Sequence, residues 1–156
     1  MSLKGSSAPD FELYTTGKNL FKLSEHRGNS VVLLFFPGAF TGVCTNELNM
    51  VNNDLGSYAG ATVVGISTDS PFALAEFKKV NGLTFDLLSD HNASVCASYG
   101  AKYNNDFTAM KLDRIARRAA FVVDPSGAVV YEEVLESAGD LPDLDAVKSV
   151  LADSSK

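Results

Sequence analysis

Apolar runs of strand length alternate with segments of helical period along this chain, and this alternation constrains its fold more than any other feature. Val31–Phe36 and Ala61–Ser67 are mostly apolar and have the length of buried strands. Between them, Leu48, Val51 and Leu55 recur at the spacing of one helix face. Because parallel neighbours in a sheet need a crossover of this kind, the pattern predicts a βαβ unit in an α/β fold.

The remaining elements follow from the same periods and from turn residues. We expect an N-terminal hairpin, a capped helix, a short strand, a short helix, a second hairpin and a closing helix, in that order: Phe11–Tyr14 with Leu20–Leu23, Pro71–Asn81, Phe85–Leu88, Asn92–Tyr99, Ala119–Val123 with Ala128–Tyr131, and Leu141–Ala152. The first seven residues and the Ser/Lys tail are expected to be frayed. With 156 residues, 46% of them hydrophobic, the chain suits one domain over residues 1–156.

Charge and hydropathy limit the classes of function. The chain carries 13 Lys and Arg against 19 Asp and Glu, a net charge of -6, with no long basic run. This balance argues against nucleic acid or an anionic membrane as a partner. The apolar runs are too short to span a bilayer, and the opening residues lack the apolar core of a signal peptide. We therefore expect a cytoplasmic protein.

A single cysteine stands where the first predicted strand gives way to the helix. The run continues as Pro37-Gly-Ala-Phe-Thr-Gly-Val-Cys44, so the thiol is expected at a helix N-terminus. Unpaired N–H groups and the helix dipole favour an anion there. A free cysteine on its own more often packs as a small hydrophobic side chain. A proline, a hydroxyl and a thiol in one turn instead favour a reactive thiolate.

The spacing Pro37-x-x-x-Thr41-x-x-Cys44 resembles the active-site signature of the peroxiredoxins, thiol peroxidases with a thioredoxin-like fold. The likeness extends from Ala8-Pro-Asp-Phe11 to the Arg118–Asp124 strand. It implies a central mixed β-sheet flanked by helices, with an N-terminal β-hairpin extension. It also implies that hydrogen peroxide and organic hydroperoxides are reduced through a sulfenic acid on the cysteine. The sequence holds no phosphate loop, dinucleotide fingerprint or metal-ligand motif, so we expect neither a cofactor nor a metal.

The resemblance assigns roles to three residues of the turn and to one arginine. Cys44 is the nucleophile, Thr41 orients the peroxide, and Pro37 shields the thiolate from water. The family places an arginine beside the sulfur, three residues before the first aromatic residue of a distant strand. Counting back from Phe121 gives Arg118.

Strand periodicity alone does not choose among the neighbouring arginines. A guanidinium stabilises both a thiolate and a departing oxygen, but Arg117 and Arg118 face opposite sides of a strand and Arg114 also competes. On the substrate side, we further expect the backbone N–H of Val43 in the anion hole, the aromatic ring of Phe40 at the pocket rim or a dimer contact, and the first-turn carboxylate of Glu47 beside the arginine, which it holds.

Cys96 decides the subclass. It shares the small-residue face of a short predicted helix with Ala93 and Gly100, which is a packing pattern. We therefore expect a one-cysteine enzyme, recycled by an external thiol or thioredoxin-like reductant, and aromatic residues near the site indicate a homodimer. An atypical two-cysteine enzyme in which Cys96 resolves stays open. So do a thiol–disulfide or glutathione-dependent transferase and a redox-sensing or chaperone-like module, which relative rates with peroxide and disulfide would separate.

Overall fold

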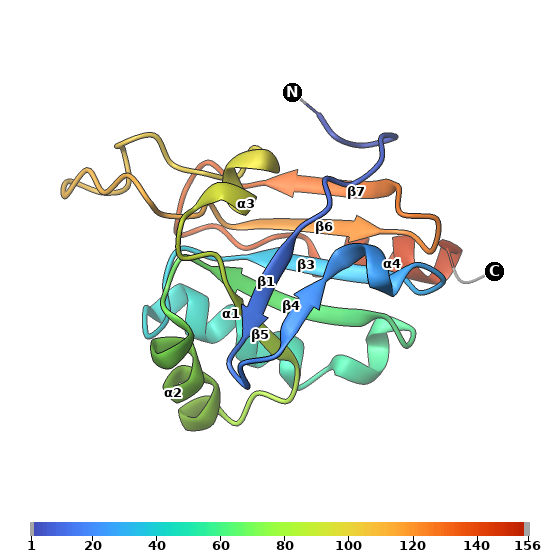
Figure 1. Cartoon of the computed structure of the whole chain (residues 1–156), viewed down its shortest axis with the longest axis horizontal. Helices are drawn as coiled ribbons and strands as arrows, with labels where there is room; N and C mark the ends of the chain where they lie inside the picture. Colours follow the sequence, from blue (N-terminus) through green and yellow to red (C-terminus); the bar gives the residue numbers. More distant parts are fainter. Residues whose placement is uncertain (1, 155–156) are drawn as a thin grey trace.

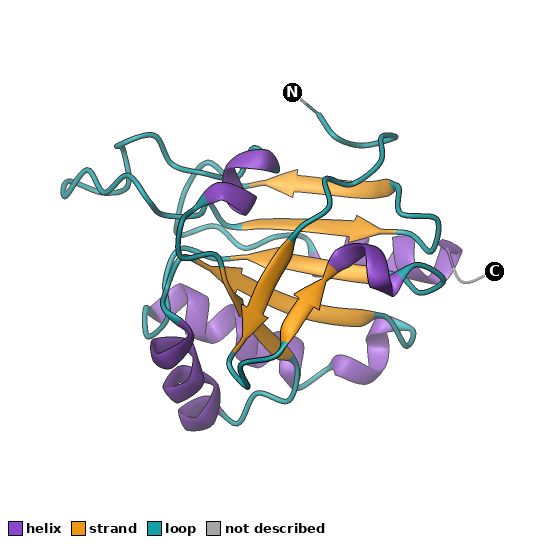
Figure 2. Ribbon diagram, in the orientation of Figure 1, coloured by secondary structure: helices purple, strands orange, loops and turns teal. Residues whose placement is uncertain are grey.

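A mixed β-sheet runs through the middle of the computed structural model, which describes residues 2–154 (Figure 1). Within these residues the strands follow the order β2-β1-β5-β4-β3-β6-β7, and helices lie on both faces (Figure 2). The strands are β1 (Glu12–Thr15), β2 (Leu20–Lys22), β3 (Val31–Phe35), β4 (Thr62–Ser67), β5 (Asp86–Ser89), β6 (Ala119–Val123) and β7 (Val129–Val134). The helices are α1 (Gly42–Asn52), α2 (Pro71–Asn81), α3 (Ser94–Ser98) and α4 (Leu144–Ser154), with 3₁₀ turns at Leu23–His26 and Leu55–Tyr58.

The predicted βαβ unit is confirmed at the centre of the sheet. β3 pairs in parallel with β4 and antiparallel with β6, and α1 makes the crossover from β3 to β4. The N-terminal hairpin joins the same sheet because β1 pairs antiparallel with β5. The closing helix begins later than predicted, at Leu144, because the Asp143 carboxylate accepts a hydrogen bond from the N–H of Ala146 and so caps the helix there.

The sheet separates two hydrophobic cores. Successive residues of β3 face opposite sides, so Val32 and Leu34 enter one core while Leu33 and Phe35 enter the other. One face is covered by α1, α2 and α4, and its core includes Cys44. The N-terminal hairpin and α3 cover the other face, whose core includes Cys96.

The prediction that the first seven residues fray is wrong for the described part of that segment, and Met1 lies outside the described residues. The N–H of Gly5 donates to the Val129 carbonyl at 2.8 Å, the N–H of Val129 donates to the Ser6 carbonyl at 2.8 Å, and Ser7 forms a β-bridge with Ala128. β7 is an edge strand whose outer N–H and C=O groups need partners, and this segment supplies some of them. Residues 155 and 156 of the predicted tail lie outside the described residues.

A long segment between α3 and β6 extends away from the sheet, at the left of Figure 1. Two isolated bridges, Lys102 with Ala116 and Phe107 with Leu112, bring its two limbs together. This segment lies near the end of the sheet at which β3 stops and α1 begins. Among residues 2–154, no helix is long and apolar enough to cross a membrane.

Candidate active site

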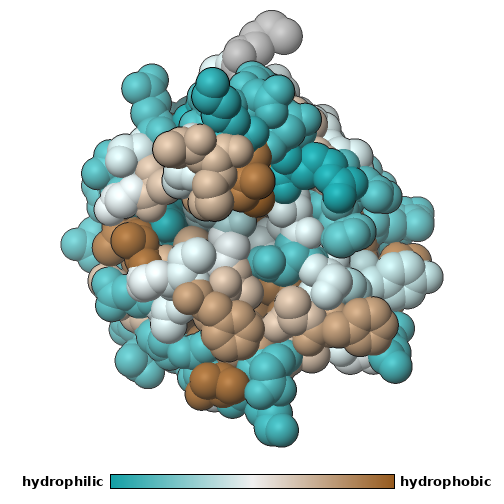
Figure 3. All heavy atoms as spheres, turned by 90° about the vertical axis from the view of Figure 1, so that its left-hand side faces the viewer, coloured by the Kyte–Doolittle hydropathy of each residue, from teal (hydrophilic) through white to brown (hydrophobic). Residues whose placement is uncertain are grey.

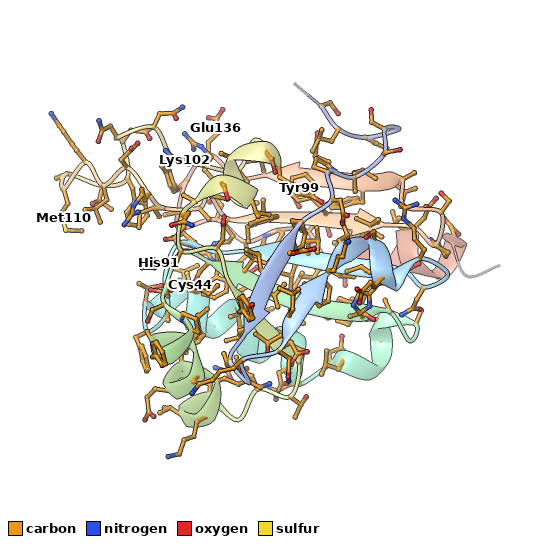
Figure 4. The ribbon with its side chains drawn as sticks, viewed as in Figure 1. Cys44, His91, Tyr99, Lys102, Met110 and Glu136 are labelled. Atoms are coloured by element: carbon orange, nitrogen blue, oxygen red, sulfur yellow. The ribbon has the colours of Figure 1, made fainter. Side chains whose placement is uncertain are left out.

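The turn after β3 places Cys44 in the first turn of α1. Pro37 is buried directly after the strand, and Phe40 adopts a left-handed backbone conformation with φ of 66°. The extended backbone of Thr41 then starts the helix. A residue other than glycine keeps a left-handed backbone conformation only where its surroundings hold it there. The turn therefore has one defined backbone shape. Cys44 lies in the helix that follows this turn, and 1% of its surface is exposed (Figure 4).

The start of α1 offers unpaired donors to an anion. Within residues 2–154, the N–H groups of Gly42, Val43 and Cys44 have no hydrogen-bond acceptor, whereas the N–H of Thr45 donates to the Thr41 carbonyl at 3.0 Å. The first N–H groups of a helix lack intrahelical partners and lie at the positive end of its dipole. The sulfur of Cys44 therefore lies where negative charge is stabilised.

Pairing of β6 with β3 brings Arg118 to the sulfur. Phe35 lies opposite Ala119, so the residue before β6 lies beside the end of β3. The Arg118 Nη2 group donates to Cys44 Sγ at 3.3 Å and to the Ala138 carbonyl at 3.0 Å. With 1% of its surface exposed, the guanidinium is a buried cation whose cost is offset by these partners.

Glu47 completes the buried group from the same helix as the sulfur. Three residues after Cys44, it lies on the same side of α1, fully buried, and its Oε1 accepts from Arg118 Nη1 at 2.6 Å. Burial raises the pKa of the Glu47 carboxyl to about 7, and the charge of Arg118 opposes that shift. Within residues 2–154, Glu47 Oε2 and Arg118 Nε are buried without a hydrogen-bond partner.

The two adjacent arginines are separated by strand alternation. Arg117 Nη2 lies 3.3 Å from a carboxylate oxygen of Asp106, and its guanidinium lies 4.4 Å from the centre of the Tyr103 ring. Arg114 is exposed on the long segment before β6. Of the three candidates, the structure places the guanidinium of Arg118 against the sulfur.

The other predicted residues of the turn lie nearer the surface. The Thr41 hydroxyl donates to the Gly38 carbonyl at 2.7 Å, and no hydrogen bond joins it to Cys44 within the described residues. Its oxygen keeps lone pairs that can accept a hydrogen bond from a ligand. Phe40 is 56% exposed, and its ring meets the edge of Phe77 with the ring centres 5.2 Å apart. Both residues therefore lie at the surface, in the turn that leads to Cys44.

Two contacts at this site were missed from the sequence. The Ala138 carbonyl is a backbone group in an irregular segment, and no side-chain pattern marks it. The N–H of Ala39 donates to the Asp69 carboxylate at 2.8 Å, although Asp69 reads in sequence as the start of a helix cap. Its position directly after β4, the parallel neighbour of β3, is the signal that could have found it.

Cys96 has different surroundings on the other face of the sheet. Its thiol donates to the Ala93 carbonyl at 3.4 Å, and the Asp90 carboxylate accepts from its backbone N–H at 2.7 Å. Burial, reinforced by the charge of Asp90, raises the pKa of the Cys96 thiol to about 12. Burial and the charge of Asp90 therefore disfavour the thiolate form of Cys96 at neutral pH.

Comparison with known proteins finds close relatives of one kind. A family model described as AhpC/TSA family matches residues 4–132. A Mycobacterium tuberculosis protein whose name assigns it to the peroxiredoxins is 38% identical over 131 residues, covering 83% of each chain. The "Thiol peroxidase" of Oceanobacillus iheyensis is 33% identical over 148 residues, covering 94% of this chain and 87% of the relative.

Solved structures give the same result for the fold. Peroxidoxin BcpB from Mycobacterium tuberculosis superposes with a TM-score of 0.84 at 29% identity, covering 98% of both chains. Peroxiredoxin Q from Xanthomonas campestris gives a TM-score of 0.80 at 27% identity, covering 94% of this chain and 92% of that one. These matches confirm the predicted fold class over nearly the whole chain.

Proposed function

The chain belongs to the AhpC/TSA family and is a thiol peroxidase of the peroxiredoxin kind, and we propose that it works as a one-cysteine enzyme with Cys44 as its nucleophile. The observation that carries this proposal is the contact between Cys44 Sγ and Arg118 Nη2 at 3.3 Å, at the open N-terminus of α1. A fixed cation and unpaired N–H groups supply what a reactive thiolate and a departing oxygen both need.

The proposed reaction begins with attack of the Cys44 thiolate on one oxygen of hydrogen peroxide or an organic hydroperoxide. An S–O bond forms and the O–O bond breaks, so sulfur is oxidised to sulfenic acid and the other oxygen leaves as water or an alcohol after taking a proton. Arg118 and the N–H groups of Val43 and Cys44 stabilise the charge on the oxygens. Thr41 orients the peroxide, and Pro37 keeps water from the thiolate.

The sheet between the two cysteines favours external recycling. Cys44 and Cys96 belong to hydrophobic cores on opposite faces, and both are buried. A disulfide needs Cα atoms within about 7 Å, which side chains on opposite faces of a sheet do not provide. We therefore propose that an external thiol, small or carried by a thioredoxin-like protein, condenses with the sulfenic acid and releases water. A second thiol then reduces the mixed disulfide and restores Cys44.

We propose a homodimer in the cytoplasm as the working form. Large apolar side chains are exposed, among them Phe40 at 56% in the turn before Cys44 and Phe72 at 73% on α2, and Figure 3 shows apolar patches on the side of the molecule that carries the long segment. Exposed apolar patches of this kind favour association. Two free thiols and a thiol reductant suit a reducing compartment. Sedimentation of the wild type and Phe40→Ser tests the dimer, which the substitution should weaken.

Intact mass after one equivalent of peroxide tests the chemistry. The wild type should gain a single oxygen that dimedone traps on Cys44, whereas Cys44→Ser should stay unmodified and lose turnover. Cys96→Ala is the matched control and should behave as the wild type.

Three outcomes would count against the proposal. Turnover retained by Cys44→Ser would exclude this nucleophile. Loss of two hydrogens in the wild type, with a peptide that joins Cys44 to Cys96, would show the two-cysteine mechanism instead. Reaction with disulfides as fast as with peroxide would favour the transferase.

A further inference from the structure

Asp69 lies outside the group around Cys44 but holds the turn that leads to it. Its Oδ2 accepts two hydrogen bonds, from the N–H of Ala39 at 2.8 Å and from the hydroxyl of Ser67 at 2.7 Å. The helix-capping function belongs to the next residue, since Ser70 Oγ accepts from the N–H of Ala73. The carboxylate of Asp69 is therefore committed to the turn and not to α2.

The turn from residue 37 to residue 41 has few other hydrogen bonds to the rest of the protein. Apart from the bonds that Thr45 of α1 donates to the Thr41 carbonyl, the bond from Ala39 to Asp69 is the one, within residues 2–154, that ties this turn to the rest of the protein. The Thr41 hydroxyl bonds back to Gly38 inside the turn. Phe40 keeps a left-handed conformation that its own side chain disfavours. The shape of the turn thus depends on the acceptor that Asp69 provides.

Asp69 is itself held from two sides. The buried hydroxyl of Ser67, at the end of β4, fixes the carboxylate, and the hydroxyl of Ser89, at the end of β5, donates to the Asp69 carbonyl at 2.6 Å. Two adjacent strands therefore anchor one acceptor, and that acceptor anchors the turn after a third strand. A support of this kind transmits the rigidity of the sheet to an irregular segment.

We propose that Asp69 is a positioning residue for the peroxide reaction. Through the N–H of Ala39 it fixes the turn that presents Pro37 and Thr41 to the peroxide, so its removal slows that reaction without disabling the thiol. This inference rests on the proposed function of Cys44. A neutral acceptor serves as well as a carboxylate, because Asp69 Oδ2 accepts both bonds and an amide oxygen can replace it.

Asp69→Ala and Asp69→Asn separate the hydrogen bond from the charge, because both remove the charge and the asparagine keeps an acceptor. The chain has no tryptophan, so oxidation of Cys44 is followed by mass in rapidly quenched samples. Asp69→Ala should slow oxidation by peroxide by roughly tenfold to a hundredfold, and Asp69→Asn by less than about threefold, since small displacements of positioning groups have effects of this size. Alkylation of Cys44 by iodoacetamide, which does not use the turn, should stay within about twofold in both.

Ser70→Ala is the matched control. It removes the cap of α2 at the neighbouring position and so lowers folding stability, but it leaves the bond to Ala39 intact. Its peroxide rate should equal that of the wild type. If Asp69→Ala does not fold, Asp69→Glu gives the same test, because its longer side chain keeps the charge but cannot place an oxygen at the same point without moving the turn.

Each contrary result has a separate meaning. The wild-type peroxide rate in Asp69→Ala, or in Asp69→Glu where that variant replaces it, would overturn the positioning function. So would an equal loss in Ser70→Ala, an equal loss in Asp69→Asn, or a parallel loss of alkylation. A wild-type protein that does not react with peroxide would overturn the function proposed for Cys44, and the two failures are therefore distinguishable.

Discussion

Cys44 and Cys96 are hidden to the same degree, with 1% and 0% of their surface exposed, on opposite faces of one sheet. Cys44 meets a guanidinium and unpaired helix N–H groups. Cys96 meets a carbonyl and the charge of Asp90, and the pKa of its thiol is raised to about 12. Burial thus does not decide whether a cysteine reacts. Burial favours the protonated thiol at Cys96, and the negative charge of Asp90 adds to that effect, whereas at Cys44 a buried cation lies against the sulfur.

The contrast between the two cysteines should change most when Arg118, the cation beside Cys44, is replaced. Arg118→Lys should slow the reaction of Cys44 with peroxide by about tenfold or more, because one ammonium cannot reproduce the forked contacts to Cys44, Glu47 and Ala138. Arg117→Ala is the matched control and should stay within about twofold, since that guanidinium faces Asp106. Single-turnover oxidation, followed by quenching and mass, measures both. Greater damage from Arg117→Ala would mean that the strand register is wrong.

A smaller effect should appear in the pH dependence of stability, through Glu47. Its pKa is raised from 4.5 to about 7, so across that range the folded chain retains a proton that the unfolded chain has released. Stability should therefore fall as pH rises through this window, by on the order of 1–3 kcal/mol from this group.

A glutamine has no carboxyl proton to release, so the free energy of unfolding of Glu47→Gln should not fall with pH in this way. Urea unfolding at several values between about pH 5 and pH 8 measures it. Glu76→Gln, at an exposed position of α2, should unfold with the same pH dependence as the wild type. A slope that persists unchanged in Glu47→Gln would assign the titration to another group.

The smallest effect on turnover and stability should come from replacing Cys96, on the other face of the sheet. Cys96→Ala removes one buried sulfur and should lower the free energy of unfolding by about 1 kcal/mol, with turnover by an external thiol unchanged. Native protein should be alkylated at Cys44 and not at Cys96, whose thiol stays protonated, whereas unfolded protein should be alkylated at both. Alkylation of native protein at Cys96 would remove the contrast between the two thiols.

Much of this fold follows from local pattern. Period and turn residues predicted the βαβ unit, the two hairpins and the helix from Pro71 to Asn81, which has the bounds expected from its cap and its closing glycine. The predicted start of α4 was three residues early, since an apolar leucine at 141 extends the helical pattern beyond the cap at Asp143. The ordered N-terminal segment was missed because its bonds to β7 join residues far apart in the chain.

The site was less predictable than the fold, for a related reason. Alternation showed that Arg117 and Arg118 face opposite ways, but only the resemblance chose between them, because a single strand does not reveal what lies on either side. The carbonyl of Ala138 and the N–H of Ala39 are backbone groups, which carry no residue-specific signal, so the position of Asp69 after β4 is the one sequence feature that points to the second contact. Sequence patterns therefore identify the proposed nucleophile more readily than the groups that lie around it.

The contact between Cys44 and Arg118 joins residues 74 positions apart, and the Ala138 carbonyl lies a further 20 residues along the chain from that arginine. During synthesis, which proceeds from the N-terminus, Cys44 leaves the ribosome long before Arg118 and the carbonyl that anchors this arginine. Until then the Cys44 thiol lacks the guanidinium that contacts it in the folded chain. The order of the chain thus delays the contact between the sulfur and its cation until the segment before β6 has been made.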